Sequence, residues 1–375
     1  MADLHSIDEA IDAIRAGELV IVVDDDDREN EGDLVMAAGL ATPEKMAFMI
    51  RHCCGIVCSP ITAETARRLR LDPMVSANDA PLGTAFTVSV DYRYGLTTGI
   101  SAEERVSTVR GLANGNAGPE DFVRPGHIFP LIARDGGVLV RSGHTEAAVD
   151  LTRLAGLEPA AIICELVNDH GSVKRLPELI DFAREHDLKI VSIADLIEYR
   201  QRREHLVERI SEMSTTTIAG PAKAVVFQTP FDGIQHMALV FGDIGSGKDV
   251  LARIHREQPM SDLFGSDGRR SMETAMNRLG REGRGVFVLL RDPLASQPLP
   301  GNAESQGSDE ADAGNEDHGS AQKRLQQWRE VGIGAQILRD LGIDSIRLLA
   351  AHQRHYVGLS GFGIEISETV LLEDG

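Results

Sequence analysis

Cysteine is scarce in this chain, and no long apolar run occurs in it. Four cysteines are found among 375 residues, and they do not form the pattern of a disulfide-stapled secreted domain. The first residues lack the basic and apolar segments of an export signal. No stretch reaches the roughly 18 apolar residues that a membrane helix needs. We therefore expect reduced thiols, a cytoplasmic location and no membrane partner.

Basic side chains are also under-represented. Lys and Arg total 38 against 58 for Asp and Glu, which gives a formal net charge of −20. A nucleic-acid binder needs a basic face, so nucleic acid is excluded as the expected partner. A small anionic substrate stays compatible with this charge, because a few arginines in a cleft can hold one phosphate.

Cys54 and Cys58 have two interpretations. Their Cys-x-x-x-Cys spacing would supply half of a zinc site, but no second Cys or His pair stands in a matching arrangement. Cysteine also serves as a small apolar packing residue, and this second interpretation is favoured.

The chain is long enough for two domains, at about 150 residues each. Helical and extended patterns alternate through the first two hundred residues, which predicts an α/β layered domain. Helices are expected at 6–16, 43–52, 62–69, 102–112, 146–155, 176–186 and 193–204. Strands are expected at 19–23, 34–40, 55–58, 86–90, 160–167 and 189–192.

The second half begins after a polar connection. The domains are expected at 1–203 and 204–375, and the second half shows strands at 224–228, 237–241, 286–290 and 345–349 and a helix at 322–341. Residues 295–320 contain almost no apolar side chains, which predicts a disordered insertion.

An acidic loop over residues 24–33 follows the apolar run 19–23. Like charges at this density repel one another, and a core does not take them unpaired. The loop is therefore either a solvated turn or a segment prepared for a cation and a polar substrate. A calcium loop starting at Asp27 is rejected, because its twelfth position is Ala38 where a bidentate Glu is required.

Two further segments have features of an anion site. Residues 242–248 match a phosphate-binding loop until Asp249 replaces the Ser or Thr that would hold magnesium, so a hairpin turn is the preferred interpretation. Residues 141–145 open a helix, where free amides and the helix dipole favour an anion, and Arg141 adds a charged fork. Glu165 lies in the apolar run 162–167 and is a candidate acid or base.

Taken together, these segments resemble 3,4-dihydroxy-2-butanone 4-phosphate synthase, an enzyme of riboflavin biosynthesis. The matching motifs are DRENEGD at 27–33, GIVC at 55–58, TTGISA at 97–102, RPGHIFPL at 124–131, RSGHTEAAVDL at 141–151 and ICE at 163–165. They cover nearly all of residues 1–203. Cys53 and Cys54 depart from the small residues usual at their positions.

The resemblance implies an α-β-α layered domain with a mixed sheet, and a carbon–carbon lyase that forms homodimers. The lyase would convert D-ribulose 5-phosphate into 3,4-dihydroxy-2-butanone 4-phosphate and formate with magnesium, manganese being an alternative ion. Glu29 and His144 would hold the metal, and His127 and Glu165 would be catalytic. The substrate would be bound by Arg28, Glu29, Asp33, Arg141, Ser142, Gly143, His144, Thr145 and Glu165.

The second half resembles GTP cyclohydrolase II, a second α/β domain. That enzyme's zinc is held by three cysteines, whose places here carry Gln258, Arg269 and Ser271. A thiolate zinc site cannot form without thiolates, so no zinc and no GTP hydrolysis are expected. Two alternatives stay open: an atypical cyclohydrolase activity, or a domain that binds a nucleotide or a protein partner for regulation.

Overall fold

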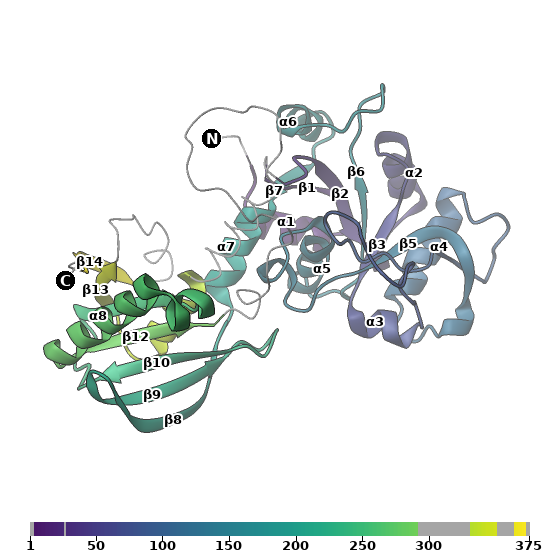
Figure 1. Ribbon diagram of the computed structural model, residues 1–375. Coiled ribbons are helices and arrows are strands. Elements are labelled where there is room, and N and C mark those ends of the chain that lie inside the picture. Colours follow the sequence, from purple (N-terminus) through teal and green to yellow (C-terminus); the bar gives the residue numbers. More distant parts are fainter. Residues whose placement is uncertain (1–3, 26–27, 292–330, 351–363, 373–375) are drawn as a thin grey trace. The chain divides into compact units, whose positions relative to one another are not determined.

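The computed structural model describes residues 4–25, 28–291, 331–350 and 364–372. The described chain forms two compact units, one ending at Arg200 and the other starting at Gln201 (Figure 1). The predicted insertion at 295–320 lies outside the described residues. None of the described helices has the length and apolarity needed to cross a membrane.

The first unit is built on a mixed seven-stranded sheet. Its strands are β1 (Val20–Val23), β2 (Gly32–Ala37), β3 (Cys58–Ile61), β4 (Val90–Tyr92), β5 (Phe122–Ile132), β6 (Ala161–Glu165) and β7 (Lys189–Ser192). They lie in the order β4-β5-β3-β6-β2-β1-β7. The β1–β7 and β3–β5 pairs are parallel, and the β1–β2, β2–β6, β3–β6 and β4–β5 pairs are antiparallel.

Helices cover both faces of this sheet (Figure 1). One face packs on α2 (Pro43–His52), α3 (Ala63–Arg68), α4 (Ala102–Ala113) and α6 (Leu176–Glu185), which share one apolar core with alternate strand residues. The other face packs on α5 (His144–Leu154), which also contacts α1 (Ile7–Arg15). The last helix of this unit is α7 (Ile193–Arg203), whose final three residues belong to the second unit. The predicted layered α-β-α arrangement with a mixed sheet is therefore confirmed.

The ends of these helices follow from local sequence. Ser6 and Ser101 each accept a hydrogen bond from the amide three residues on, and Glu9 and Glu104 reach back to the Ser6 and Ser101 amides. Such reciprocal capping satisfies donors that have no intrahelical acceptor. Thr42 caps α2 by accepting from the Lys45 amide at 3.3 Å, ahead of a proline at the first helical position.

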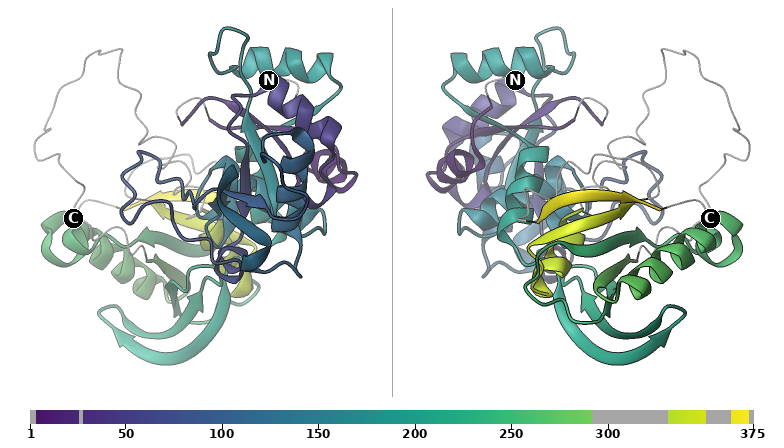
Figure 2. Two further views of the ribbon diagram at one scale, coloured as in Figure 1. Left: turned by 90° about the vertical axis from the view of Figure 1, so that its right-hand side faces the viewer. Right: turned by 90° about the vertical axis from the view of Figure 1, so that its left-hand side faces the viewer.

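The second unit has its own mixed sheet, in the order β14-β13-β11-β12-β10-β9-β8. Its strands are β8 (Glu208–Thr217), β9 (Gly220–Gln228), β10 (Gln235–Phe241), β11 (Val250–Arg256), β12 (Gly285–Leu290), β13 (Ser345–Ala350) and β14 (Glu365–Leu371). Helix α8 (Ser266–Glu282) packs its Ala275 and Leu279 against this sheet. The long β8–β9 hairpin is strongly curved (Figure 2). Residues 331–340 form the described part of the helix expected at 322–341.

Local predictions were wrong at one turn and at one helix start. Residues 242–249 are not a hairpin turn, because β12 lies between β10 and β11 in the sheet. Helix α5 begins at His144 rather than at residue 146, with Gly143 as its N-cap.

Candidate functional site

The acidic loop is anchored between β1 and β2, whose pairing closes at Val23 and Gly32. Asp24 organises it: its carboxylate accepts hydrogen bonds from the amides of Glu29 and Glu31, both at 2.9 Å. Arg28 donates to Asp24 at 2.9 Å and also pairs with Glu29. The described part of the loop is therefore an ordered structure rather than a freely solvated turn. Asp26 and Asp27 lie outside the described residues.

Carboxylates from this loop meet the first residue of α5. Glu29 Oε2 lies 3.5 Å from His144 Nδ1. Ligand atoms of Asp24, Glu29 and His144 lie within 4.8 Å of one another, and so do those of Glu31, Asp33 and His144. Asp33 is directly opposite Glu165 in the β2–β6 ladder. Glu29, Asp33, His144 and Glu165, four of the residues expected at the site, are thus brought to one end of the sheet.

Burial and mutual repulsion dominate the electrostatics of this cluster. Burial raises the pKa of Asp33 well above its usual range. Burial and the neighbouring charge of Glu29 raise the pKa of Glu31 to about 7. Burial also opposes ionisation of Glu29, but the hydrogen bond to His144 and the charge of Arg28 outweigh it and lower the pKa to about 2. The negative charge of Asp33 and Glu29 outweighs the burial of His144 and raises its pKa to about 9.

Two buried atoms of the cluster have no hydrogen-bond partner among the described residues: His144 Nε2 and Asp33 Oδ1. A buried polar atom without a partner is costly, and such atoms often mark a site for an ion. Carboxylate oxygens with one imidazole nitrogen suit a hard or borderline divalent cation. The residues present therefore fit a divalent metal, with Glu29 and His144 as the expected ligands.

His127 lies on β5, and a buried carboxylate holds its ring. Asp91 of β4 accepts a hydrogen bond from the His127 amide at 2.8 Å through Oδ1, and its Oδ2 lies 2.8 Å from His127 Nδ1. A β-carbon at Gly99, whose φ is +81°, would overlap the Asp91 carboxylate. Sequence patterns did not single out Asp91, because an isolated Asp between Val90 and Tyr92 carries no motif.

Glu104 holds the loop at residues 97–99, which packs against Asp91 and His127. Its carboxylate accepts from the Thr97 amide at 2.6 Å, the Thr97 hydroxyl at 2.7 Å and the Thr98 amide at 3.1 Å. These hydrogen bonds stabilise the ionised carboxylate and lower the pKa of Glu104, and the bond from the Thr97 amide has the largest effect. Glu104 therefore fixes the segment that packs against Asp91 and His127.

Strand register relates His127 to Glu165. Cys58 of β3 pairs with Phe129 of β5 and with Ile163 of β6. His127 lies two residues before Phe129 on β5, which runs parallel to β3. Glu165 lies two residues after Ile163 on β6, which runs antiparallel to β3. His127 and Glu165 are therefore at the same height along the strands, and their side chains are on the same face of the sheet. The spacing across two strand intervals is about 10 Å.

The start of α5 is less open than expected. Arg141 pairs with Glu146 at 2.6 Å, and its other Nη atom donates to the Leu82 carbonyl at 3.2 Å and the Thr84 hydroxyl at 3.3 Å. The guanidinium therefore lies against the helix start rather than free in solvent. The first amides of α5 have no intrahelical acceptor, as at any helix N-terminus. Gly143, Ser142 and Thr145 lie around them.

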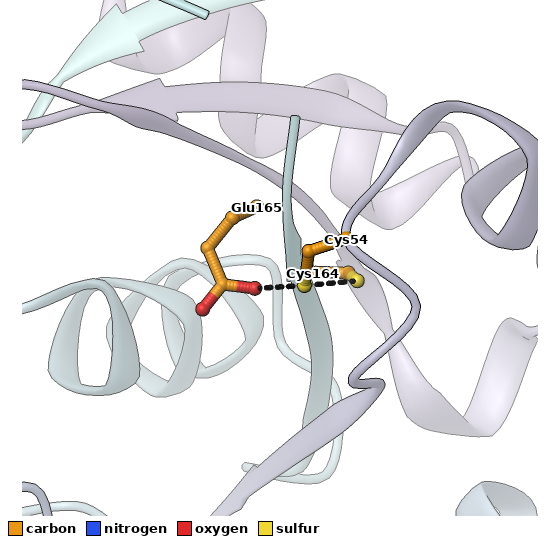
Figure 3. Close-up of side chains that lie close together, drawn as sticks. All are labelled: Cys54, Cys164 and Glu165. Atoms are coloured by element: carbon orange, nitrogen blue, oxygen red, sulfur yellow. Dashed lines mark hydrogen bonds between the residues drawn. The ribbon is translucent and has the colours of Figure 1, made fainter. Parts of the chain in front are cut away.

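Glu165 is the last residue of β6 and is half-buried. The Cys54 thiol donates to its Oε2 at 2.8 Å (Figure 3). The prediction that Cys54 and Cys58 are apolar packing residues fits the buried Cys58, but it is wrong for Cys54, which is exposed.

Comparisons with known proteins identify both units. The 3,4-dihydroxy-2-butanone 4-phosphate synthase profile matches residues 8–199, and the GTP cyclohydrolase II profile matches residues 208–371. The chain is 50% identical to the monofunctional riboflavin biosynthesis protein RIBA 2 of Arabidopsis thaliana, over 98% of this chain and 77% of that protein. It is 47% identical to the riboflavin biosynthesis protein RibBA of Nocardia farcinica, over 99% and 91%.

Solved structures agree. A two-domain 3,4-dihydroxy-2-butanone 4-phosphate synthase from A. baumannii, RibBX, superposes with a TM-score of 0.78 at 37% identity, covering 99% of this chain and 100% of that one. A 3,4-dihydroxy-2-butanone 4-phosphate synthase in complex with two magnesium ions gives a TM-score of 0.51 at 45% identity, covering 53% and 98%. The chain therefore belongs to the 3,4-dihydroxy-2-butanone 4-phosphate synthase family, and a domain of the GTP cyclohydrolase II family follows its synthase domain.

Proposed function

We propose that this enzyme converts D-ribulose 5-phosphate into 3,4-dihydroxy-2-butanone 4-phosphate and formate at the cluster around His144. The convergence of Glu29, Asp33, Glu165 and His144 on one end of the sheet is the observation that carries the proposal. The reaction needs enolisation, loss of water, a skeletal shift and loss of one carbon. Each of these steps moves protons next to a carbonyl or hydroxyl, which requires charged groups in a partly buried site.

Magnesium is the expected cofactor, with manganese as a substitute, and Glu29 and His144 would hold it. A divalent ion bound there would lower the pKa of neighbouring sugar hydroxyls and stabilise negative charge that develops on them. His144 is well placed as a ligand, because its Nε2 is buried and unpartnered among the described residues. Asp33 would bind the sugar hydroxyls.

His127 and Glu165 are proposed to carry the proton transfers. A carboxylate can only accept, so Asp91 holds the proton of His127 on Nδ1 and leaves the Nε2 lone pair available as a base. Glu165 faces the same side of the sheet at the same level. Asp91 acts through His127 and is a positioning residue.

The substrate phosphate is proposed to bind at the start of α5. The first amides of α5, which have no intrahelical acceptor, and the helix dipole favour an anion there. Arg141 and Arg28 supply positive charge, although Arg141 is paired with Glu146 and Arg28 with Asp24. We therefore expect both guanidinium groups to exchange part of these pairings for the phosphate and the sugar.

The reaction is tested by product balance. The full chain, incubated with ribulose 5-phosphate and magnesium, is expected to form one formate and one four-carbon phosphate for each sugar consumed. Consumption of the sugar without a four-carbon phosphate would refute the proposed reaction.

The second unit is proposed to have no GTP cyclohydrolase activity. Gln258 follows β11, and Arg269 and Ser271 lie on α8, so the three places expected to hold zinc carry no thiolate. Arg269 instead pairs with Glu273 at 2.9 Å. The names of two relatives, one "monofunctional" and one a two-domain synthase, support this proposal. Other relatives are named bifunctional, which keeps an atypical GTP activity as the alternative.

GTP turnover and GTP calorimetry separate these alternatives. We expect the full chain to consume no GTP and to give no heat with it. GTP consumption would establish the atypical enzyme, and heat without turnover would establish a nucleotide-binding regulatory domain. We also propose that the protein is cytoplasmic and forms a homodimer. Light scattering of the full chain tests the dimer through its mass.

A further inference from the structure

A second cluster of metal-ligating atoms lies beside the proposed magnesium site. The sulfur atoms of Cys54 and Cys164 are 3.8 Å apart, and the Cys54 sulfur lies 2.8 Å from Glu165 Oε2 (Figure 3). All three ligand atoms lie within 4.8 Å of one another. The motifs of the sequence did not predict this cluster, and neither the reaction nor the magnesium ligands use its sulfur atoms.

The backbone holds the cluster in place before any ligand arrives. The Cys54 amide donates to the Glu165 carbonyl at 2.9 Å, and the neighbouring Cys53 forms an antiparallel bridge with Leu166. Two segments separated by 110 residues are therefore fixed against each other. Cys164 is buried at the bottom of the cluster and Cys54 is exposed, which gives an ion a route in.

The sulfur spacing fits a tetrahedral metal better than a disulfide. With a Zn–S distance of about 2.3 Å, two thiolates on one tetrahedral zinc stand about 3.8 Å apart. A disulfide requires about 2.05 Å between the sulfur atoms, so they would have to approach by well over 1 Å. The carboxylate would need to open its contact with Cys54 to about 3.6 Å, which rotation about its side-chain bonds allows.

The chemistry of the ligands separates the two clusters. Thiolates are soft ligands that select zinc-like ions, whereas the oxygens around His144 suit magnesium. We propose that Cys54, Cys164 and Glu165 bind a thiophilic divalent cation of the zinc and cadmium class, and that this cation inhibits the enzyme. Binding displaces the two thiol protons to solvent and forms two metal–sulfur bonds and one metal–oxygen bond, with no change of oxidation state.

Inhibition follows because the cation takes the Glu165 carboxylate out of the reaction, and this part of the proposal rests on the proposed function of Glu165. Three protein ligands leave a fourth position for water on the exposed side. A chelator can therefore remove the ion, which makes the inhibition reversible.

Binding is tested first, with a readout that does not depend on activity. The full chain under reducing conditions and excess magnesium is titrated with Co²⁺, which gives a sulfur-to-cobalt charge-transfer band when thiolates bind it. We expect one equivalent of cobalt to produce the band, Zn²⁺ to abolish it, and Cys54→Ser and Cys164→Ser to lack it. Cys58→Ser, which changes a buried thiol outside the cluster, is the matched control and should keep the band. No band in the unaltered protein, or an undiminished band in Cys54→Ser, would overturn the site.

Inhibition is tested second, by formate release at saturating magnesium with increasing Zn²⁺. Each variant is compared with its own zinc-free rate, and Cys54→Ser is expected to need at least about tenfold more zinc for half-inhibition, because it loses a direct ligand. Equal sensitivity of Cys54→Ser and the unaltered protein would overturn the inhibitory role. Inhibition that a reductant reverses and a chelator does not would identify a disulfide and also overturn it. Absence of formate in every sample would refute the proposed function alone, since the cobalt band is read independently.

Discussion

Replacing Asp91 with Asn tests the proposed proton-transfer machinery at one buried position. Asp91 is 3% exposed and makes both of its contacts with His127 at 2.8 Å. In Asp91→Asn the amide oxygen can still accept from the His127 backbone amide. The amide nitrogen then faces Nδ1 and donates to it, which moves the ring proton to Nε2. The base would lose its lone pair at the atom where the reaction needs it.

The expected changes in rate and in stability follow from the moved ring proton and from the loss of the carboxylate charge. A positioned acid or base contributes about 10²–10⁴ in rate, so kcat should fall by at least about a hundredfold. Loss of charged hydrogen bonds costs about 1–3 kcal/mol of stability. That is less than the roughly 5–15 kcal/mol of a typical domain, so the variant should fold. KM and the affinity for magnesium should change little, because the proposed ligands Glu29 and His144 are untouched.

The assay is formate release at saturating substrate and magnesium, with the far-ultraviolet circular dichroism of each variant as the folding check. Asp12→Asn is the matched control, since it makes the same chemical change on α1 at a carboxylate whose side chain is 72% exposed. It should keep the unaltered rate. A kcat for Asp91→Asn within about threefold of the unaltered enzyme would show that Asp91 does not position His127.

Three further predictions concern the same site. Gly99→Ala should lower kcat by at least about tenfold, because the added methyl overlaps the Asp91 carboxylate and Gly99 has a positive φ; unchanged kinetics would disprove the close packing. Glu29→Gln should abolish the rise in melting temperature that magnesium gives the unaltered protein, which differential scanning calorimetry measures; an equal rise in both would remove Glu29 from the metal site. Magnesium affinity should increase from pH 6 to pH 9, because His144, with its pKa raised to about 9, and Glu31, with its pKa raised to about 7, must lose protons before the ion binds. A pH-independent affinity, measured by isothermal calorimetry, would contradict this order of events.

Sequence patterns located elements well where a local signal and tertiary packing agree. The helices expected at 6–16 and 102–112 are observed as α1 and α4, and their N-caps are Ser6 and Ser101. The apolar run at 19–23 also placed β1, because a strand buried on both faces leaves a continuous hydrophobic segment.

Local signals failed where tertiary pairing overrides them. Strand β5 contains Pro125 and Gly126, and it pairs on either side of them, with β3 at residues 129–132 and with β4 at residues 122, 123 and 128. The link between β10 and β11 has a turn-like sequence, but β12, which lies between these two strands in the sheet, follows both of them in the chain. No local pattern reports such a crossover.

The site residues also divide into those that a local sequence motif indicates and those that only the tertiary structure reveals. Glu29, Asp33 and His144 lie in dense motifs, and the structure brings them together. Asp91 and Cys54 act only through partners distant in sequence, His127 at 36 residues and Glu165 at 111. Such pairs depend on strand register, which a single sequence specifies weakly.

The most direct test of the account is formate release from ribulose 5-phosphate by the full chain, with magnesium and after its removal by a chelator. Glu29→Gln is assayed alongside. We predict magnesium-dependent formate from the unaltered protein and none above background from Glu29→Gln, with both folded. No formate from the folded, magnesium-loaded protein would contradict the proposed reaction, and full activity of Glu29→Gln would contradict the metal site on which it depends.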